Sequence, residues 1–296
     1  MKLYLLLLSL FSFILITGCT SADIQQTFFP TQGQEESTDG YIIQEIVFPK
    51  DDMHLQKDFP LNPTVRISNT GPFESDGQVC ISGLDSSSFR GFTGCECNVF
   101  RSVKEERSFL PEDVTFGPYN ILQENSQEYT LTAITRYKYK STANVEMCIK
   151  ENAVDMASCN SNLISTKDGP LRILSVNQIT SPVSDTEAAI SFEIKVEKQT
   201  EGDVWDLNAV QERCRPEREI RRNVRAKINN LPFRANSNCG EVKFDKDEMT
   251  INCNLGEVQL VELSGRSQFG SNYNPQIEVE LDYAFETRAS NKFIVG

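Results

Sequence analysis

The sequence predicts an all-β protein, and three observations lead to that prediction. Short apolar runs recur from Tyr41 onward and are separated by clusters of Gly, Pro, Asn and Asp. Residues 277–286 alternate apolar with mostly acidic side chains, which is the two-residue period of a strand with one face buried. Helical periodicity is almost absent. The number and spacing of the runs predict two tandem immunoglobulin-like β-sandwiches.

The 296 residues are expected to form two domains behind an exported leader, since one domain per roughly 150 residues is usual. The predicted segments are a lipoprotein signal peptide at 1–18, a lipidated cysteine with a flexible tether at 19–40, a first sandwich at 41–160, a linker at 161–170 and a second sandwich at 171–296. The linker lies in a polar stretch that ends with Gly169-Pro170.

The leader has a positive start at Lys2 and an apolar run at 3–16, too short for a membrane-spanning helix, which takes about 20 residues. The run ends Ile16-Thr17-Gly18-Cys19, which resembles the lipobox of prokaryotic lipoproteins. That resemblance implies cleavage before Cys19 and acyl chains, such as palmitate, on the new N-terminus. It makes Cys19 the membrane anchor of an extracellular or periplasmic chain. The alternative is an ordinary signal peptide with Cys19 incidental.

The tether that follows is rich in Ser, Thr, Gln and Gly and contains no Lys or Arg. Such a segment buries too little apolar surface to order itself. A flexible chain of about 20 residues spans about 25 Å on average, which lifts a domain clear of the headgroups. Its one apolar patch, Phe28-Phe29-Pro30, suits contact with a partner or with the first strand.

The apolar runs give the candidate strands. In the first half these are 42–48, 64–68, 78–82, 103–110, 129–139 and 145–149, and in the second half 171–176, 189–196, 224–228, 242–244, 249–253, 258–263 and 277–286. In the last of them, the acidic side chains at 278, 280, 282 and 286 are expected to face solvent.

The two halves look like copies of one template. Tyr137-x-Tyr139 and Tyr283-x-Phe285 are each followed at the same spacing by an apolar pair, and Gly77-x-Val79 matches Gly202-x-Val204. The alternative is the chance periodicity of β proteins. The Asn69-Thr70-Gly71 turn after an alternating strand is similar to CARDB-like surface domains of archaea and bacteria. That resemblance implies a fold and no site residues.

The chain has nine cysteines, and eight remain if Cys19 is lipidated: Cys80, Cys95, Cys97, Cys148, Cys159, Cys214, Cys239 and Cys253. An even number in an exported chain favours disulfides. The expected local pairs are Cys148–Cys159 and Cys239–Cys253. Five cysteines fall in the first half and three in the second, so either one bridge crosses between halves or two thiols stay free.

Residue types for catalysis or metal binding are sparse. The one-residue gap of Cys95-Glu96-Cys97 differs from the C-x₂₋₄-C of structural zinc, so no metal is predicted. Ser-His-Asp and Cys-His catalysis need a positioned histidine, and the sole histidine, His54, lies in a polar loop. No enzyme activity and no cofactor are predicted, although the paired carboxylates of a glycoside hydrolase have no required spacing.

Charge restricts the partners. The net charge of -13 argues against nucleic acid, whose binding needs clustered Lys and Arg. One basic segment at 213–225 is the candidate binding surface, and its arginines are Arg213, Arg215, Arg218, Arg221, Arg222 and Arg225. The alternative is pairing of these arginines with the acidic side chains of 277–286, worth about 0–1 kcal/mol per exposed pair.

Together these features predict a non-enzymatic lipoprotein of the cell surface or envelope that acts as a binding or structural module. The expected partners are the membrane, through Cys19, and an envelope protein or surface polysaccharide. Loops at the sandwich ends, including residues 95–97, are the expected contact surface. The alternative is a lipid-anchored carboxylate-based hydrolase or solute-binding protein.

Overall fold

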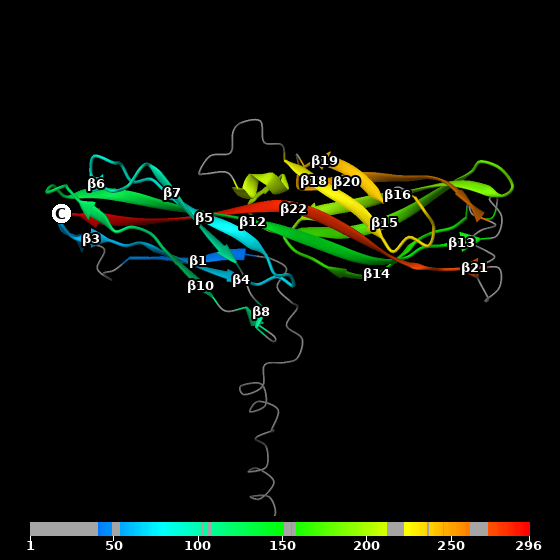
Figure 1. Ribbon diagram of the computed structural model, residues 1–296, viewed down its shortest axis with the longest axis horizontal. Helices are drawn as coiled ribbons and strands as arrows, with labels where there is room; N and C mark the ends of the chain where they lie inside the picture. Colours follow the sequence, from blue (N-terminus) through cyan, green and yellow to red (C-terminus); the bar gives the residue numbers. More distant parts are fainter. Residues whose placement is uncertain are drawn as a thin grey trace, which may run out of the picture. The chain divides into compact units, whose positions relative to one another are not determined.

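The computed structural model confirms the all-β class (Figure 1). It describes residues 41–48, 54–101, 104–105, 108–109, 111–150, 155, 158–211, 222–235, 237–244, 246–260 and 272–296. The predicted signal peptide at 1–18 and the lipidated Cys19 with its tether to residue 40 lie outside these residues. The immunoglobulin-like type of the two sandwiches stays a prediction.

Strands follow one another with a single short 3-10 helix among the described elements. They are β1 (Tyr41–Val47), β2 (His54–Leu55), β3 (Pro60–Leu61), β4 (Thr64–Asn69), β5 (Asp76–Ser82), β6 (Phe89–Arg90), β7 (Cys95–Arg101), β8 (Lys104–Glu105), β9 (Ser108–Phe109), β10 (Glu112–Thr115), β11 (Tyr119–Ile121), β12 (Gln127–Glu146), β13 (Ile149–Lys150), β14 (Asn162–Lys167), β15 (Leu171–Pro182), β16 (Glu187–Lys198), β17 (Asp203–Trp205), η1 (Leu207–Gln211), β18 (Asn223–Asn229), β19 (Asn238–Lys243), β20 (Glu248–Gln259), β21 (Asn272–Tyr273) and β22 (Gln276–Val295).

A long antiparallel ribbon of β12 and β22 runs through both halves of the protein (Figure 1). The two strands have 20 residues each and pair without interruption from Gln127 opposite Val295 to Glu146 opposite Gln276. They form the middle of a nine-stranded sheet with the order β19-β18-β22-β12-β5-β7. The last strand of the chain thereby returns to the first half, where the Gly296 N–H donates to the Leu55 carbonyl over 2.8 Å.

A second layer covers each half of the ribbon. In the first half it is the sheet β1-β4-β10, and the Asn291 amide of β22 donates to the Ile46 carbonyl of β1 over 3.1 Å. In the second half it is the sheet β15-β16-β20, where the Leu171 N–H of β15 donates to the buried Tyr283 hydroxyl of β22 over 3.2 Å. Apolar side chains between the layers form one continuous buried cluster along the ribbon.

Several predicted boundaries fall inside longer elements. The candidate strand 129–139 and the first two residues of 145–149 lie in β12, and β20 unites 249–253 with the start of 258–263. The candidate strand 103–110 contains the short hairpin pair β8 and β9. The segment predicted as a linker, 161–170, contains β14, which pairs with the end of β12. Side chains of β14 are mostly exposed, so an edge strand carries the polar composition of a loop.

At the middle of the ribbon a buried ion pair joins the two strands. Arg136 lies directly opposite Glu286, with 2.5 Å between Nε and Oε2, and the two side chains are 1% and 0% exposed. Arg288 donates from its Nε to the other carboxylate oxygen of Glu286 over 2.7 Å. The expectation that Glu286 faces solvent is therefore wrong. Helix η1 contacts β5, β12 and β22 on the face of the ribbon that carries these charged side chains, which we call its polar face. The centre of the ribbon is therefore covered on both faces.

The two glycines of the proposed repeat flank this pair. A Cβ on Gly77 would lie 2.5 Å from the Arg136 carbonyl oxygen, and one on Gly202 would lie 2.5 Å from the Glu286 carbonyl oxygen. Both positions need glycine because a backbone passes too close for any side chain. The aromatic motifs of the repeat, by contrast, pair with each other, Tyr137 opposite Phe285 and Tyr139 opposite Tyr283.

The ion pair generates a double-mutant prediction. Glu286→Leu should destabilise the protein by about 3–5 kcal/mol, because it leaves a guanidinium buried without its carboxylate. Arg136→Met should cost less, because Arg288 still binds Glu286. The double variant should cost far less than the sum of the two, since no buried charge is left alone. Urea denaturation of all four proteins measures these differences.

Arg66→Met is the matched control, because its pair with Asp113 has side chains 40% and 48% exposed. It should leave the denaturation midpoint almost unchanged. Additive effects of Arg136→Met and Glu286→Leu would contradict a direct interaction between the two buried charges.

Candidate functional site

The described members of the predicted arginine surface bind carboxylates of the chain itself. Arg222 lies 3.2 Å from Asp203 through Nη2, and its guanidinium carbon lies 5.6 Å from the centre of the Trp205 ring. Arg225 binds Glu241 at 2.8 Å and Asp206 at 3.7 Å. These carboxylates lie outside 277–286, where Glu280 and Asp282 instead face Lys227. Arg213, Arg215, Arg218 and Arg221 lie outside the described residues.

Three disulfides join described cysteines. Cys148 is bonded to Cys159 and Cys239 to Cys253, the two pairs expected from spacing. The second bridge ties β19 of the nine-stranded sheet to β20 of the other layer. Cys80 is bonded to Cys97, its directly opposite neighbour on β7, with 4.0 Å between the Cα atoms. Cys95 is also disulfide-bonded, and Cys214 lies outside the described residues.

Residues 95–97 were expected in a loop, but they lie in strand β7, where they pair with β5, and both cysteines are disulfide-bonded. Glu96 accepts a hydrogen bond from the Tyr119 hydroxyl over 2.6 Å. The backbone of His54 pairs with Ile294 at the end of β22.

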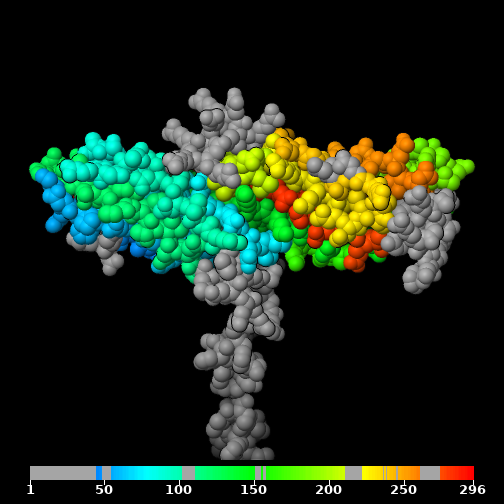
Figure 2. All heavy atoms as spheres, in the orientation of Figure 1, coloured from blue at the N-terminus to red at the C-terminus, as the bar shows by residue number. Residues whose placement is uncertain are grey.

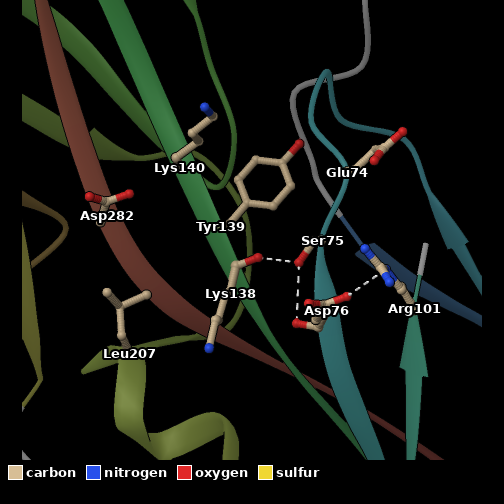
Figure 3. A pocket seen from close by; sticks show the side chains of 9 residues that line it. All are labelled: Glu74, Ser75, Asp76, Arg101, Lys138, Tyr139, Lys140, Leu207 and Asp282. Atoms are coloured by element: carbon tan, nitrogen blue, oxygen red, sulfur yellow. Dashed lines mark hydrogen bonds and ion pairs between the residues drawn. The ribbon is translucent and has the colours of Figure 1, made fainter. Parts of the chain in front are cut away.

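A hollow of about 390 Å³ opens on the polar face of the ribbon, where the two halves meet (Figure 3). It is lined by Glu74, Ser75, Asp76, Arg101, Lys138, Tyr139, Lys140, Leu207 and Asp282. These residues come from β5, β7, β12, β22, η1 and the turn before β5. The space-filling view shows the β5–β7 region in cyan bordering η1 in yellow-green at the middle of this face (Figure 2).

The register of the ribbon determines which of its side chains lie beside the hollow. Lys138 and Lys140 stand two residues apart on one face of β12. Opposite them on β22 are Ala284 and Asp282, respectively. Ala284 is itself covered, at 1% exposure, whereas Lys138 is exposed and lines the hollow one step along the ribbon from the Arg136–Glu286 pair. The Ser75 hydroxyl donates to the Lys138 carbonyl and holds the turn before β5 against β12 (Figure 3).

Charges of both signs line the hollow. Arg101 lies 3.5 Å from Asp76, and the Lys140 ammonium sits 4.8 Å from the centre of the Phe73 ring. Asp282 is 3.4 Å from Lys227, which makes a closer contact with Glu280. Burial, and next the neighbouring Glu280 charge, raise the pKa of Asp282 above its ordinary value. Lys138 makes no ion pair within the described part of the chain.

This hollow was not predicted from the sequence, although one signal for it was present. Arg136, Lys138 and Lys140 place three cations on alternate positions of a single strand in an acidic chain. Their acidic neighbours come from strands far away in sequence, so nothing local connects them.

A second hollow of about 320 Å³ lies between β16, β17 and the end of β19. It is lined by Lys198, Gly202, Asp203, Val204, Arg222, Phe244, Lys246 and Asp247. Most of its charges are already paired, Lys198 with Asp247 at 3.0 Å and Arg222 with Asp203 at 3.2 Å. We therefore take the hollow on the ribbon as the stronger candidate site.

In the described segments no group of three or more His, Cys, Asp and Glu side chains is placed to hold a metal ion. Within those same segments, no helix combines the length and the apolar composition that crossing a bilayer requires. The sequence matches no protein-family model. No curated protein matches it either.

The raised pKa of Asp282 predicts a pH-dependent cost to stability. Below its ordinary pKa of 3.8 the carboxyl is protonated in both folded and unfolded chains. As the pH rises the unfolded chain loses this proton first, so the contribution of Asp282 to stability falls until the folded pKa is passed. Asp282→Asn should therefore stabilise the protein at neutral pH, and the gain should shrink toward pH 3.8. Urea denaturation across this range measures it.

The exposed Asp185→Asn, in the turn between β15 and β16, is the matched control and should not change stability at either end of the range. A loss of stability in Asp282→Asn at neutral pH would show that its contact with Lys227 outweighs the cost of its burial.

Proposed function

We propose that this chain is a non-enzymatic lipoprotein that acts as a binding module on the extracytoplasmic side of a membrane, anchored through acyl chains on Cys19. The observation that carries the proposal is the set of three disulfides among the described residues. Structural disulfides are typical of proteins that fold in oxidising compartments. They agree with the compartment that the lipobox-like end of the leader implies.

The frame suits presentation of a surface. Because β12 and β22 pair over their whole length, the hollow at the middle of the ribbon has walls fixed by five elements and a turn. Binding residues on rigid strands keep their geometry without the entropy cost of ordering a loop. The expected partner is an envelope protein or surface polysaccharide, and nucleic acid is not expected.

The alternative of a solute-binding lipoprotein has one specific observation in its favour. The volume of about 390 Å³ lies within the range of about 300–1,000 Å³ that is usual for small-ligand sites. Both readings use the same anchor and the same frame, and differ in whether the occupant is a free solute or part of a larger molecule.

Substitution of Cys19 tests the anchor. Cys19→Ala should abolish incorporation of labelled palmitate and should either release the protein from the membrane or leave the leader uncleaved, because acyl attachment and cleavage depend on the thiol. Each buried methylene of an acyl chain contributes about 0.8 kcal/mol to membrane binding, so loss of two or more chains releases the protein. Membrane fractionation and intact-mass measurement give the result.

Ser21→Ala keeps the thiol and should fractionate as the unaltered protein does. Unchanged labelling and processing in Cys19→Ala would contradict the anchor. Cross-linking of the anchored protein in native membranes, followed by identification of what it captures, tests the binding role.

A further inference from the structure

We propose that the hollow on the ribbon binds a zwitterionic, peptide-like ligand, with Lys138 holding its carboxylate and Asp282 holding its ammonium group. This inference rests on the proposed function as a binding module and names the ligand class.

The walls select against ligands of one sign. Glu74, Asp76 and Asp282 repel a purely anionic ligand, and Arg101, Lys138 and Lys140 repel a purely cationic one. Like charges brought together at a binding surface repel each other and weaken binding. A ligand with one charge of each sign avoids both penalties when its ends meet the matching groups.

Among the cations that line the hollow, Lys138 makes the fewest contacts with charged or aromatic side chains. Arg101 is occupied by Asp76, and Lys140 lies over the Phe73 ring. Lys138 has no ion-pair partner among the described residues, and its opposite neighbour is the small Ala284. A carboxylate placed beside its ammonium would gain a charge-assisted hydrogen bond without displacing an existing contact.

Asp282 is the carboxylate that gains most from a new cation. It lies on β22, across the hollow from Asp76 and Arg101 (Figure 3). Lys227, its neighbour on β18, makes its closer contact with Glu280. Burial and the Glu280 charge disfavour the ionised form of Asp282 in the free protein, and a ligand ammonium would offset both effects.

The remaining walls accommodate a short apolar body between the two charges. The half-buried Leu207 of η1 lines one side near Asp282, and the Tyr139 ring lines another side, toward the turn at Ser75 (Figure 3). Two opposite charges separated by a small apolar body are the chemistry of a short peptide with free ends. They are also the chemistry of a Lys and a Glu side chain on one stretch of a partner protein.

Isothermal titration of the full-length protein in detergent tests the proposal with two probes. L-alanyl-L-alanine represents a free peptide, and an end-blocked Lys-Ala-Glu peptide represents a segment of a partner. At least one should bind saturably, and which one binds identifies the source. Lys138→Gln and Asp282→Asn should each weaken that binding by about tenfold or more, which corresponds to about 1.4 kcal/mol for a lost charge-assisted contact.

Lys195→Gln is the matched control, because Lys195 is an exposed lysine on β16 in the other sheet. It should bind as the unaltered protein does. Asp282→Asn also guards against a folding artefact, since it is expected to be at least as stable as the parent at neutral pH.

The proposal is overturned if neither probe binds, or if Lys138→Gln and Asp282→Asn bind as tightly as the parent. Its failure can be told apart from failure of the proposed function. The lipidated protein could capture a partner in membranes and yet bind neither probe. That result would support the binding module and contradict only the zwitterionic ligand.

Discussion

The register between β12 and β22 is the constraint on which the rest of the structure depends, and the Arg136–Glu286 pair fixes it. Alternation of apolar and polar residues forbids a slip by one residue, because every side chain would change face. It does not forbid a slip by two. Such a slip would place Arg136 opposite Ala284 or Arg288, with a buried charge unpaired or beside another cation. A buried ion pair adds little net stability over an apolar pair, so we assign it to specificity of pairing.

Once this register is set, the two halves cannot be divided into independent domains, because both contain the same two strands. The ribbon supplies the middle strands of the one nine-stranded sheet that both halves share, and β22 pairs with β2 in the first half. Gly77 and Gly202 admit β5 and the start of β17 close to the backbone on either side of the central pair. Disulfides then act locally, within the β5–β7 pair, in the turn after β12 and between β19 and β20.

Local features of the sequence predicted local features of the fold. The alternation of 277–286 placed Ile277, Val279 and Leu281 correctly in the core. Two short cysteine spacings matched bridges. Non-local facts were out of reach, because periodicity shows which face of a strand is buried and not which strand lies beside it. Glu286 was expected in solvent for this reason. Its carboxylate is buried only because Arg136, on a strand distant in sequence, lies opposite.

The hollow lies beside side chains that the same register brings together. One of them, Asp282, is expected to lower the stability of the fold. Other charged side chains on the sheet form ion pairs with each other: Lys227 with Glu280, Arg225 with Glu241 and Arg101 with Asp76. Lys138 and Asp282 depart from that pattern, one by lacking an ion-pair partner in the described chain and the other by being ionised at a cost. Replacement of Asp282 is expected to raise stability, whereas the exposed Lys138 costs none. A carboxylate that is ionised at a cost beside an open hollow is where binding is expected, because a ligand can supply the missing charge.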